Sequence, residues 1–215
     1  MYIIGHRGAR GYETENSIAS IIKAMELKAD YIELDIQTTK DGQIVLMHNP
    51  LTPNGLVVRN RTYKTITREL PELITLQVAL RAANNNRLIL DSKTDGTIAK
   101  ARRIIAKNNN ITIASFKADE ILSSRINLPN HKTFLLKTIP LGSISKSKMV
   151  DASGVGYNWA WFSLMPYYYW FASKNGLDIY IYTLNVVFIA KIMAKIFPKL
   201  LIVTDYPDKL SIIKS

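Results

Sequence analysis

The feature that most constrains the fold is an alternation of short apolar runs with longer segments of helical period. Eight runs of strand length are each followed by a helical segment. Such alternation predicts a parallel sheet, and eight repeats of the unit predict a closed α/β barrel, the (β/α)8 TIM barrel. The predicted strands are residues 1–5, 31–37, 87–90, 111–114, 132–136, 150–156, 178–182 and 200–203.

The segments between these strands are expected to be mostly helical. A short extended piece at 44–47 and a polar, turn-rich excursion at 50–71 follow the second strand. A doubly wound open sheet is the alternative, but no glycine-rich nucleotide loop follows the first strand. We therefore predict one TIM-barrel domain over residues 1–215. The predicted helices are 17–27, 72–83, 97–107, 118–126, 141–148, 164–175, 186–196 and 206–213.

Cysteine is absent, which excludes disulfides, thiolate metal sites and a cysteine nucleophile. Arg7 interrupts the N-terminal apolar run, so we expect no signal peptide and a cytoplasmic location. The uncharged segment 152–172 is aromatic and broken by glycine and proline, which disfavours a membrane span. For its run 159–171, helical packing on the barrel and contact with lipid both stay open.

The formal net charge is +11. Scattered lysines and arginines fit solvated helix faces, and they also fit attraction to phosphate-bearing substrates or to anionic lipid surfaces. No recognition motif accompanies the charge, so we expect no nucleic-acid partner. Peripheral membrane contact through the basic surface and the aromatic region stays open.

Polar side chains stand where the predicted strands end, which is the catalytic face of a barrel of this kind. Groups from separate segments would converge there. They are His6, Arg7, Glu33, Asp35, Asp91, Lys93, Ser115, Lys137, Tyr157, Asn158, Thr183, Asn185 and Asp205.

Two carboxylates on the second strand predict a cation site. Glu33 and Asp35 alternate with apolar residues and so share one face of the strand. Facing into a barrel, they repel each other unless a proton or a cation lies between them. Asp91, on the next strand of the barrel, would complete an all-oxygen site, which favours Mg²⁺ or Ca²⁺ over zinc.

His6 and His48 form the natural acid/base pair, because an unperturbed imidazole titrates near neutral pH. The third histidine of the chain, His131, lies in a polar turn and is predicted to be an ordinary surface residue. Arg7 and Lys93 add fixed positive charge suited to phosphate oxygens. Together these groups predict phosphoryl chemistry on a diester.

The sequence resembles the glycerophosphodiester phosphodiesterase family. The matching elements run through the chain in order. They are His6-Arg7-Gly8, Glu15-Asn16-Ser17, Glu33-Leu34-Asp35, Lys40-Asp41-Gly42, Val45-Leu46-Met47-His48, Asp91-Ser92-Lys93, Ser115-Phe116, Tyr182-Thr183-Leu184-Asn185 and Thr204-Asp205-Tyr206-Pro207.

The resemblance implies a TIM barrel and metal-dependent hydrolysis of a glycerophosphodiester to glycerol 3-phosphate and an alcohol. It implies that a substrate hydroxyl attacks phosphorus and forms a cyclic phosphate intermediate, with His6 as general base and His48 as general acid. The divalent cation, Mg²⁺ or Ca²⁺, would be held by Glu33, Asp35 and Asp91. The residues implied for substrate and phosphate binding are Arg7, Lys93, Glu15, Tyr182 and Asn185.

Four departures from the family pattern stand near the site. Asn49 replaces the usual aspartate, Asp91 replaces the usual glutamate, and Tyr182 stands where tryptophan is common. The excursion 50–71 is also short, which predicts a more open pocket.

Two other functions stay open. A lysophospholipase D-like or sphingomyelinase D-like enzyme shares the barrel, the two histidines and an aspartate at the third metal position. A non-catalytic barrel that binds anionic lipid is the other, and it predicts membrane binding that survives loss of His6 and His48.

Overall fold

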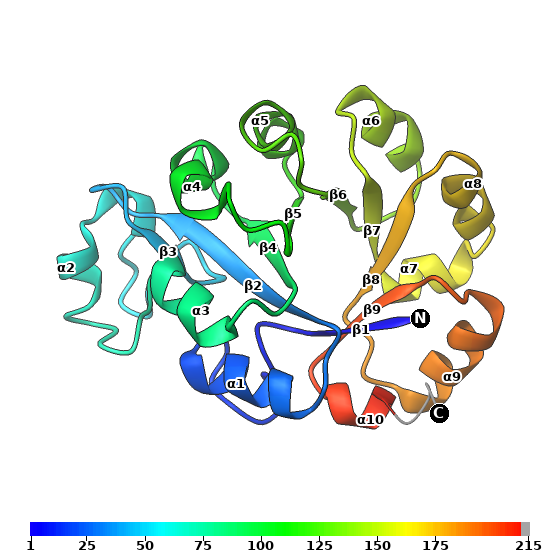
Figure 1. The fold of residues 1–215 in the computed structure, drawn as a ribbon, viewed down its shortest axis with the longest axis horizontal. Helices are drawn as coiled ribbons and strands as arrows, with labels where there is room; N and C mark the ends of the chain where they lie inside the picture. Colours follow the sequence, from blue (N-terminus) through cyan, green and yellow to red (C-terminus); the bar gives the residue numbers. More distant parts are fainter. Residues whose placement is uncertain (212–215) are drawn as a thin grey trace.

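The computed structural model describes residues 1–211, and residues 212–215, including the end of the helix expected at 206–213, lie outside the described residues. Figure 1 shows a ring of strands with helices around it. Within 1–211 the strands form one nine-stranded sheet. They are β1 (Tyr2–Gly5), β2 (Tyr31–Thr38), β3 (Ile44–Leu46), β4 (Leu88–Ser92), β5 (Ile111–Ser115), β6 (Thr133–Lys137), β7 (Gly154–Asn158), β8 (Asp178–Tyr182) and β9 (Leu201–Thr204).

The sheet closes because β1 pairs in parallel with both β2 and β9. All neighbours around the ring are parallel, and β3 alone lies outside it, antiparallel to the end of β2. This confirms the predicted TIM barrel, with the short extended piece at 44–47 as an added strand. The single domain over 1–215 stays a prediction, because it includes residues outside the described ones.

The helices lie between successive strands, as the alternation predicts, and cover the outside of the ring (Figure 1). Those described are α1 (Ile18–Glu26), η1 (Val58–Asn60), α2 (Tyr63–Ile66), α3 (Leu76–Ala83), α4 (Thr97–Ile105), α5 (Ala118–Asn127), α6 (Ser143–Met149), α7 (Trp159–Leu164), α8 (Tyr168–Lys174), α9 (Val187–Ile196) and α10 (Pro207–Ser211).

Two expected elements differ from the observed ones. The strand expected at 150–156 begins only at Gly154, because Val150 is the C-cap of α6 and packs with Ala152 in a small core against Ile121. The helix expected at 164–175 is observed as α8, which starts at Tyr168, and a separate helix that was not expected, α7, ends at Leu164. Pro166 follows the end of α7 and has no backbone N–H to continue the helix.

Side chains of the strands alternate between two cores. On β2, Ile32, Leu34 and Ile36 face outward into the layer beneath the helices. The barrel interior holds a separate cluster of smaller extent, with Ile89, Phe134 and Tyr180 in it. Successive residues of a strand point to opposite faces, so Glu33 and Asp35, which alternate with these apolar residues of β2, must point into the barrel.

Glu120 of α5 is a buried acidic residue with a structural role. Its carboxylate accepts hydrogen bonds from the Ser92 hydroxyl (2.7 Å) and from the backbone N–H groups of Gly96 (2.6 Å) and Ile98 (3.0 Å). It therefore joins the end of β4 to the start of α4, where backbone N–H groups lack helical partners.

We expect Glu120→Ala to lower the free energy of unfolding by about 3 kcal/mol, because three donors, two of them in buried hydrogen bonds, lose their acceptor. Urea denaturation followed by circular dichroism measures this loss. The matched control is Asp119→Ala, an exposed neighbour in the first turn of α5, which should cost less than about 1 kcal/mol. Equal losses in the two variants would contradict the role given to Glu120.

Within residues 1–211 none of the helices has both the length and the apolar character needed to cross a bilayer.

Candidate active site

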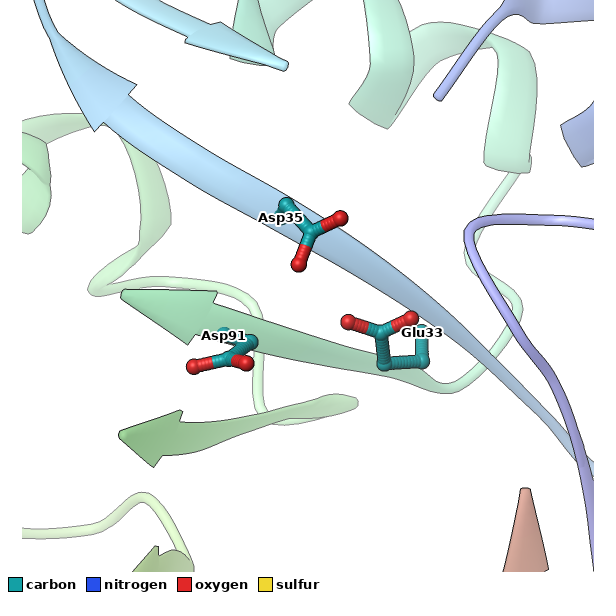
Figure 2. A group of neighbouring side chains, drawn as sticks. All are labelled: Glu33, Asp35 and Asp91. Carbon is teal, nitrogen blue, oxygen red and sulfur yellow. The ribbon is translucent and has the colours of Figure 1, made fainter. Parts of the chain in front are cut away.

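Three carboxylates lie together inside the barrel (Figure 2). Glu33 and Asp35 project from β2, and Asp91 projects from β4, where it is in register with Asp35. All three are buried, and one oxygen of each lies within 4.8 Å of the others. The period-two pattern of β2 produces this arrangement, since it directs both acids away from the outer core.

Burial and mutual repulsion govern the ionisation of this triad. Burial, followed by the charge of Asp35, raises the pKa of Glu33 well above its ordinary value. Burial also raises the pKa of Asp91 to about 6. Burial alone would also raise the pKa of Asp35, but the positive charges of Lys93 and Arg7 outweigh this effect and lower the pKa of Asp35. More positive charge is needed to hold all three carboxylates ionised at neutral pH.

Lys93 supplies part of that charge. Its Nζ lies 2.9 Å from Asp35 Oδ1 and also contacts Asp91 Oδ2. Burial alone would lower the pKa of Lys93, but the charges of Asp91 and Asp35 raise it above its ordinary value. The ammonium group is therefore permanently charged beside the triad.

The donor set fits a divalent cation. Among the described residues, the buried Asp91 Oδ1 has no hydrogen-bond partner, which leaves a carboxylate oxygen free to act as a ligand. Three buried carboxylate oxygens without nitrogen or sulfur donors match the preference of hard cations such as Mg²⁺ and Ca²⁺. The triad could hold such an ion.

His6 follows β1 and is held by an acidic partner. Its Nδ1 lies 2.7 Å from Asp205 Oδ1, and Asp205 also accepts from Asn185 Nδ2 (2.7 Å) and pairs with Arg10 Nε (3.1 Å). Because the carboxylate accepts, Nδ1 donates, and Nε2 is left unprotonated in the neutral ring. Burial lowers the pKa of His6, and the bond to Asp205 only partly offsets it, so the ring is neutral and basic at neutral pH.

His48 follows β3 and is held from two sides. Its Nδ1 lies 2.9 Å from Asn49 Oδ1, so the residue that departs from the family pattern still accepts a hydrogen bond from the ring. The buried Gln37 of β2 donates to the carbonyl oxygens of Met47 (2.8 Å) and Asn49 (2.7 Å), on either side of His48. These bonds attach the His48 segment to the barrel.

Arg7 adopts a left-handed backbone with φ of 50°, which turns the chain back over the triad. Its backbone N–H donates to Glu33 Oε2 (2.8 Å), and its Nη1 donates to both oxygens of Glu15 (2.7 and 2.8 Å). The next residue, Gly8, has φ of 88°, and a Cβ there would meet Ser20 Oγ at 2.3 Å. Glycine is therefore required in this turn, which sets the guanidinium in place.

The structure brings most of the predicted site residues to one cavity of about 160 Å³. Glu15 and Asn185 do not line it. Glu15 instead binds Arg7 from outside, and Asn185 holds Asp205 behind His6. The predicted residues that line the cavity are His6, Arg7, Glu33, Asp35, His48, Asp91, Lys93, Tyr182 and Thr183. Five others expected at this face do not line it, namely Ser115, Lys137, Tyr157, Asn158 and Asp205.

A larger cavity of about 490 Å³ lies beside the first and shares only His48 with it among the residues that line the two. Its walls come from the loop after β1 and from the excursion that follows β3, including Glu15, Leu51 and Leu73. His48 therefore stands between the two cavities.

The prediction that His131 is a surface residue is wrong. The ring is buried, and Nε2 lies 3.2 Å from the carbonyl oxygen of Ile105 and 3.1 Å from that of Asn108. It therefore holds the chain after α4 to the start of β6, away from the site.

Three residues position the site although the sequence predicted no such role for them; Asp205 was expected only to lie on the catalytic face. Asp205 orients His6, Gln37 holds the His48 segment, and Asn16 exchanges two bonds of 3.0 Å with Asp35. Asn16 and Asp205 belong to motifs already singled out, Glu15-Asn16-Ser17 and Thr204-Asp205-Tyr206-Pro207. Those motifs were the available signal, and Gln37 had only its place on the inner face of β2.

We expect Asp205→Asn to lower kcat by about 10- to 100-fold, because the amide no longer fixes the donor and acceptor nitrogens of His6. Asp205 raises the pKa of His6, so removing its charge should move the acidic limb of the kcat/KM profile to lower pH. Kinetics over a pH series test this. An unshifted limb would contradict direct coupling of Asp205 to His6.

Comparisons with known proteins agree with this site. Residues 6–95 match the model of the glycerophosphoryl diester phosphodiesterase family. A glycerophosphodiester phosphodiesterase of Bacillus subtilis is 48% identical over 56 residues, which cover 25% of this chain and 19% of that protein. The matched segment thus spans about a fifth of the length of the curated relatives.

Solved structures extend the agreement in fold to the whole chain. A phosphodiesterase of Oleispira antarctica, solved with its product sn-glycerol-3-phosphate, has a TM-score of 0.85 at 18% identity and covers 100% of this chain and 96% of its own. A glycerophosphodiester phosphodiesterase of Thermotoga maritima has a TM-score of 0.83 at 21% identity, with 100% and 97% covered.

The closed barrel has an acidic triad and two histidines at one end of its parallel strands. Over residues 6–95 the chain is similar to the glycerophosphodiester phosphodiesterase family. The solved structures support the same fold for the remainder.

Proposed function

We propose that this protein hydrolyses glycerophosphodiesters to glycerol 3-phosphate and an alcohol. The observation that carries the proposal is the cavity lined jointly by His6, His48 and the carboxylate triad. It combines an imidazole base, an imidazole acid and a place for a divalent cation, which are the groups that diester cleavage needs.

His6 acts as the general base of the first step. Its neutral ring, held through Nδ1 by Asp205, takes the proton of the 2-hydroxyl of the substrate glycerol on Nε2. The freed oxygen attacks phosphorus, the bond to the alcohol breaks, and a cyclic phosphate forms. In the second step a water molecule opens the cyclic phosphate, and His6 returns its proton to the 2-oxygen.

His48 acts as the general acid that protonates the leaving alcohol. Its position between the two cavities supports this role, because an alcohol leaving past His48 enters the larger one. In the second step His48, now neutral, accepts a proton from the attacking water, which restores both rings to their starting states.

Positive charge holds the phosphate and stabilises the charge that develops on it. Glu33, Asp35 and Asp91 would hold Mg²⁺ or Ca²⁺, which when bound supplies that stabilisation to the non-bridging oxygens. Lys93 and Arg7 add fixed charge on the chain side of the cavity. Tyr182 closes the wall of the cavity opposite the triad's strands, where we assign it a part in substrate binding.

Turnover of a substrate panel tests the proposal. Glycerophosphocholine and glycerophosphoethanolamine should release glycerol 3-phosphate and the free alcohol, whereas an analogue lacking the 2-hydroxyl should not react. Turnover of lysophosphatidylcholine alone would favour the lipid-directed alternative. A folded protein that turns over none of these would overturn the proposal and favour a binding role.

The predicted peripheral membrane contact is part of the same proposal. Substrates of this class derive from lipid headgroups, and the basic character of the chain suits an anionic surface.

A further inference from the structure

Apolar side chains are exposed on the same face of the barrel as the candidate active site. Parallel strands end at one face, and each connection after β5, β6, β7 and β8 carries one or two large apolar residues there. We define the apolar rim as Phe116, Leu141, Trp161, Leu164, Val186 and Phe188.

Exposure of this degree is unusual for such side chains. Leu164 is 71% exposed and Phe188 is 72% exposed, one at the end of α7 and the other in the first turn of α9. Contiguous exposed apolar surface marks a binding face in soluble proteins. In Figure 1 the helices α6, α7, α8 and α9 lie together on the right-hand half of the ring.

The rim continues into the catalytic cavity. Phe116, itself 45% exposed, lines that cavity and packs edge-on against Tyr182 with ring centroids 5.7 Å apart. A surface that covers the rim would therefore meet the mouth of the cavity at Phe116.

Positive charge predominates around the rim. From residue 121 to residue 204 the sequence has two acidic residues, Asp151 and Asp178, and both stand near the starts of strands, at the opposite face. Both are also neutralised, by Arg125 (2.6 Å) and Lys132 (2.8 Å). The connections after β7 and β8 have no carboxylate, whereas the connection after β5 has the exposed Asp119 and the buried Glu120 in the first turn of α5.

Lysines flank the rim without compensation. Lys137 ends β6, and Lys146 and Lys191 stand in the middle of α6 and α9. Within residues 1–211 none of these three forms an ion pair. Apolar side chains bordered by uncompensated lysines suit an anionic lipid surface, where the apolar groups enter the acyl boundary and the lysines meet phosphates.

We propose that the apolar rim docks the catalytic face of this protein onto an anionic lipid surface. A second copy of the chain is the less suitable occupant, because a symmetric contact would place like charge against like charge. Docking of this kind brings the mouth of the cavity to the membrane, where diesters with an acyl chain on the glycerol are held. Docking itself requires no turnover.

Vesicle sedimentation tests this proposal. Wild-type protein should bind vesicles of phosphatidylcholine with phosphatidylglycerol, bind phosphatidylcholine vesicles more weakly, and lose the anionic preference in high salt. The double variant Leu164→Ser/Phe188→Ser should bind the anionic vesicles roughly tenfold or more weakly.

The matched control is Ile126→Ser/Met149→Ser, which removes two side chains that are 80% and 82% exposed near the other end of the barrel. It should bind as the wild type does, and circular dichroism should show all variants folded. Equal loss in both double variants, or no vesicle binding by the wild type, would overturn the proposal. So would a dimer in sedimentation velocity without vesicles that Leu164→Ser/Phe188→Ser abolishes.

The outcome is separable from that for the proposed function. His6→Ala should bind vesicles as the wild type does, and both double variants should keep the wild-type rate on a water-soluble diester without vesicles. A wild-type protein that turns over that diester but does not bind the vesicles would overturn docking alone.

Discussion

His6→Ala is expected to lower kcat on a water-soluble glycerophosphodiester by about a thousandfold, within the range that general base catalysis contributes. The ring is neutral at neutral pH because burial lowers its pKa, and its Nδ1 is occupied by Asp205. Alanine leaves no group in the cavity that can take the proton of the attacking hydroxyl. The measurement is steady-state release of glycerol 3-phosphate.

His48→Ala should cause a similar loss with an alcohol leaving group, but not with a good one. A diester of glycerol phosphate with p-nitrophenol needs no proton on departure, so His48→Ala should regain most of its rate on it. His6→Ala should not. Recovery in His6→Ala instead would reverse the two roles.

A matched control separates chemistry from folding. His131→Ala removes a histidine that is also buried but lies away from the cavity and bonds to backbone carbonyls. It should lower the melting temperature and leave kcat of the folded protein close to the wild-type value. A thousandfold loss of kcat in this variant too would contradict a specific role for His6.

Removal of the divalent cation is the second large effect. Chelation with EDTA should reduce turnover by about a thousandfold or more, and Mg²⁺ or Ca²⁺ should restore it, because the triad then has only Lys93 and Arg7 to balance its charge. The ion that restores the rate at the lower concentration is the better fit to the site.

The same ion should stabilise the fold, since a ligand that binds only the native state raises its stability. Added Mg²⁺ or Ca²⁺ should raise the melting temperature of the wild type. Asp91→Asn should require roughly 10- to 100-fold more metal for half the effect. The control Asp95→Asn alters an exposed carboxylate paired with Lys117 and should respond as the wild type does. A melting temperature independent of metal in the wild type would contradict a site at the triad.

The local part of this site could be predicted from sequence, because it depends on strand geometry alone. Ile32, Leu34 and Ile36 face the outer core, and this directs Glu33 and Asp35 inward without reference to the rest of the chain. The alternation of strands and helices likewise predicts the barrel.

Contacts between distant segments could not be predicted in this way. Asp205 reaches His6 across 199 residues, only because β9 pairs with β1 when the barrel closes. The same holds for His131, which is buried by the chain after α4 and not by its own neighbours. The residue pattern of one segment contains no information about the register in which a strand distant in the sequence pairs with it.

The ³¹P NMR spectrum of glycerophosphoethanolamine incubated with the protein and Mg²⁺ or Ca²⁺ tests the central claim most directly. We expect the wild-type protein to replace the diester resonance by that of glycerol 3-phosphate. The diester resonance should persist with His6→Ala or in the presence of EDTA. An unchanged diester resonance, or a phosphoethanolamine resonance in place of glycerol 3-phosphate, would contradict it.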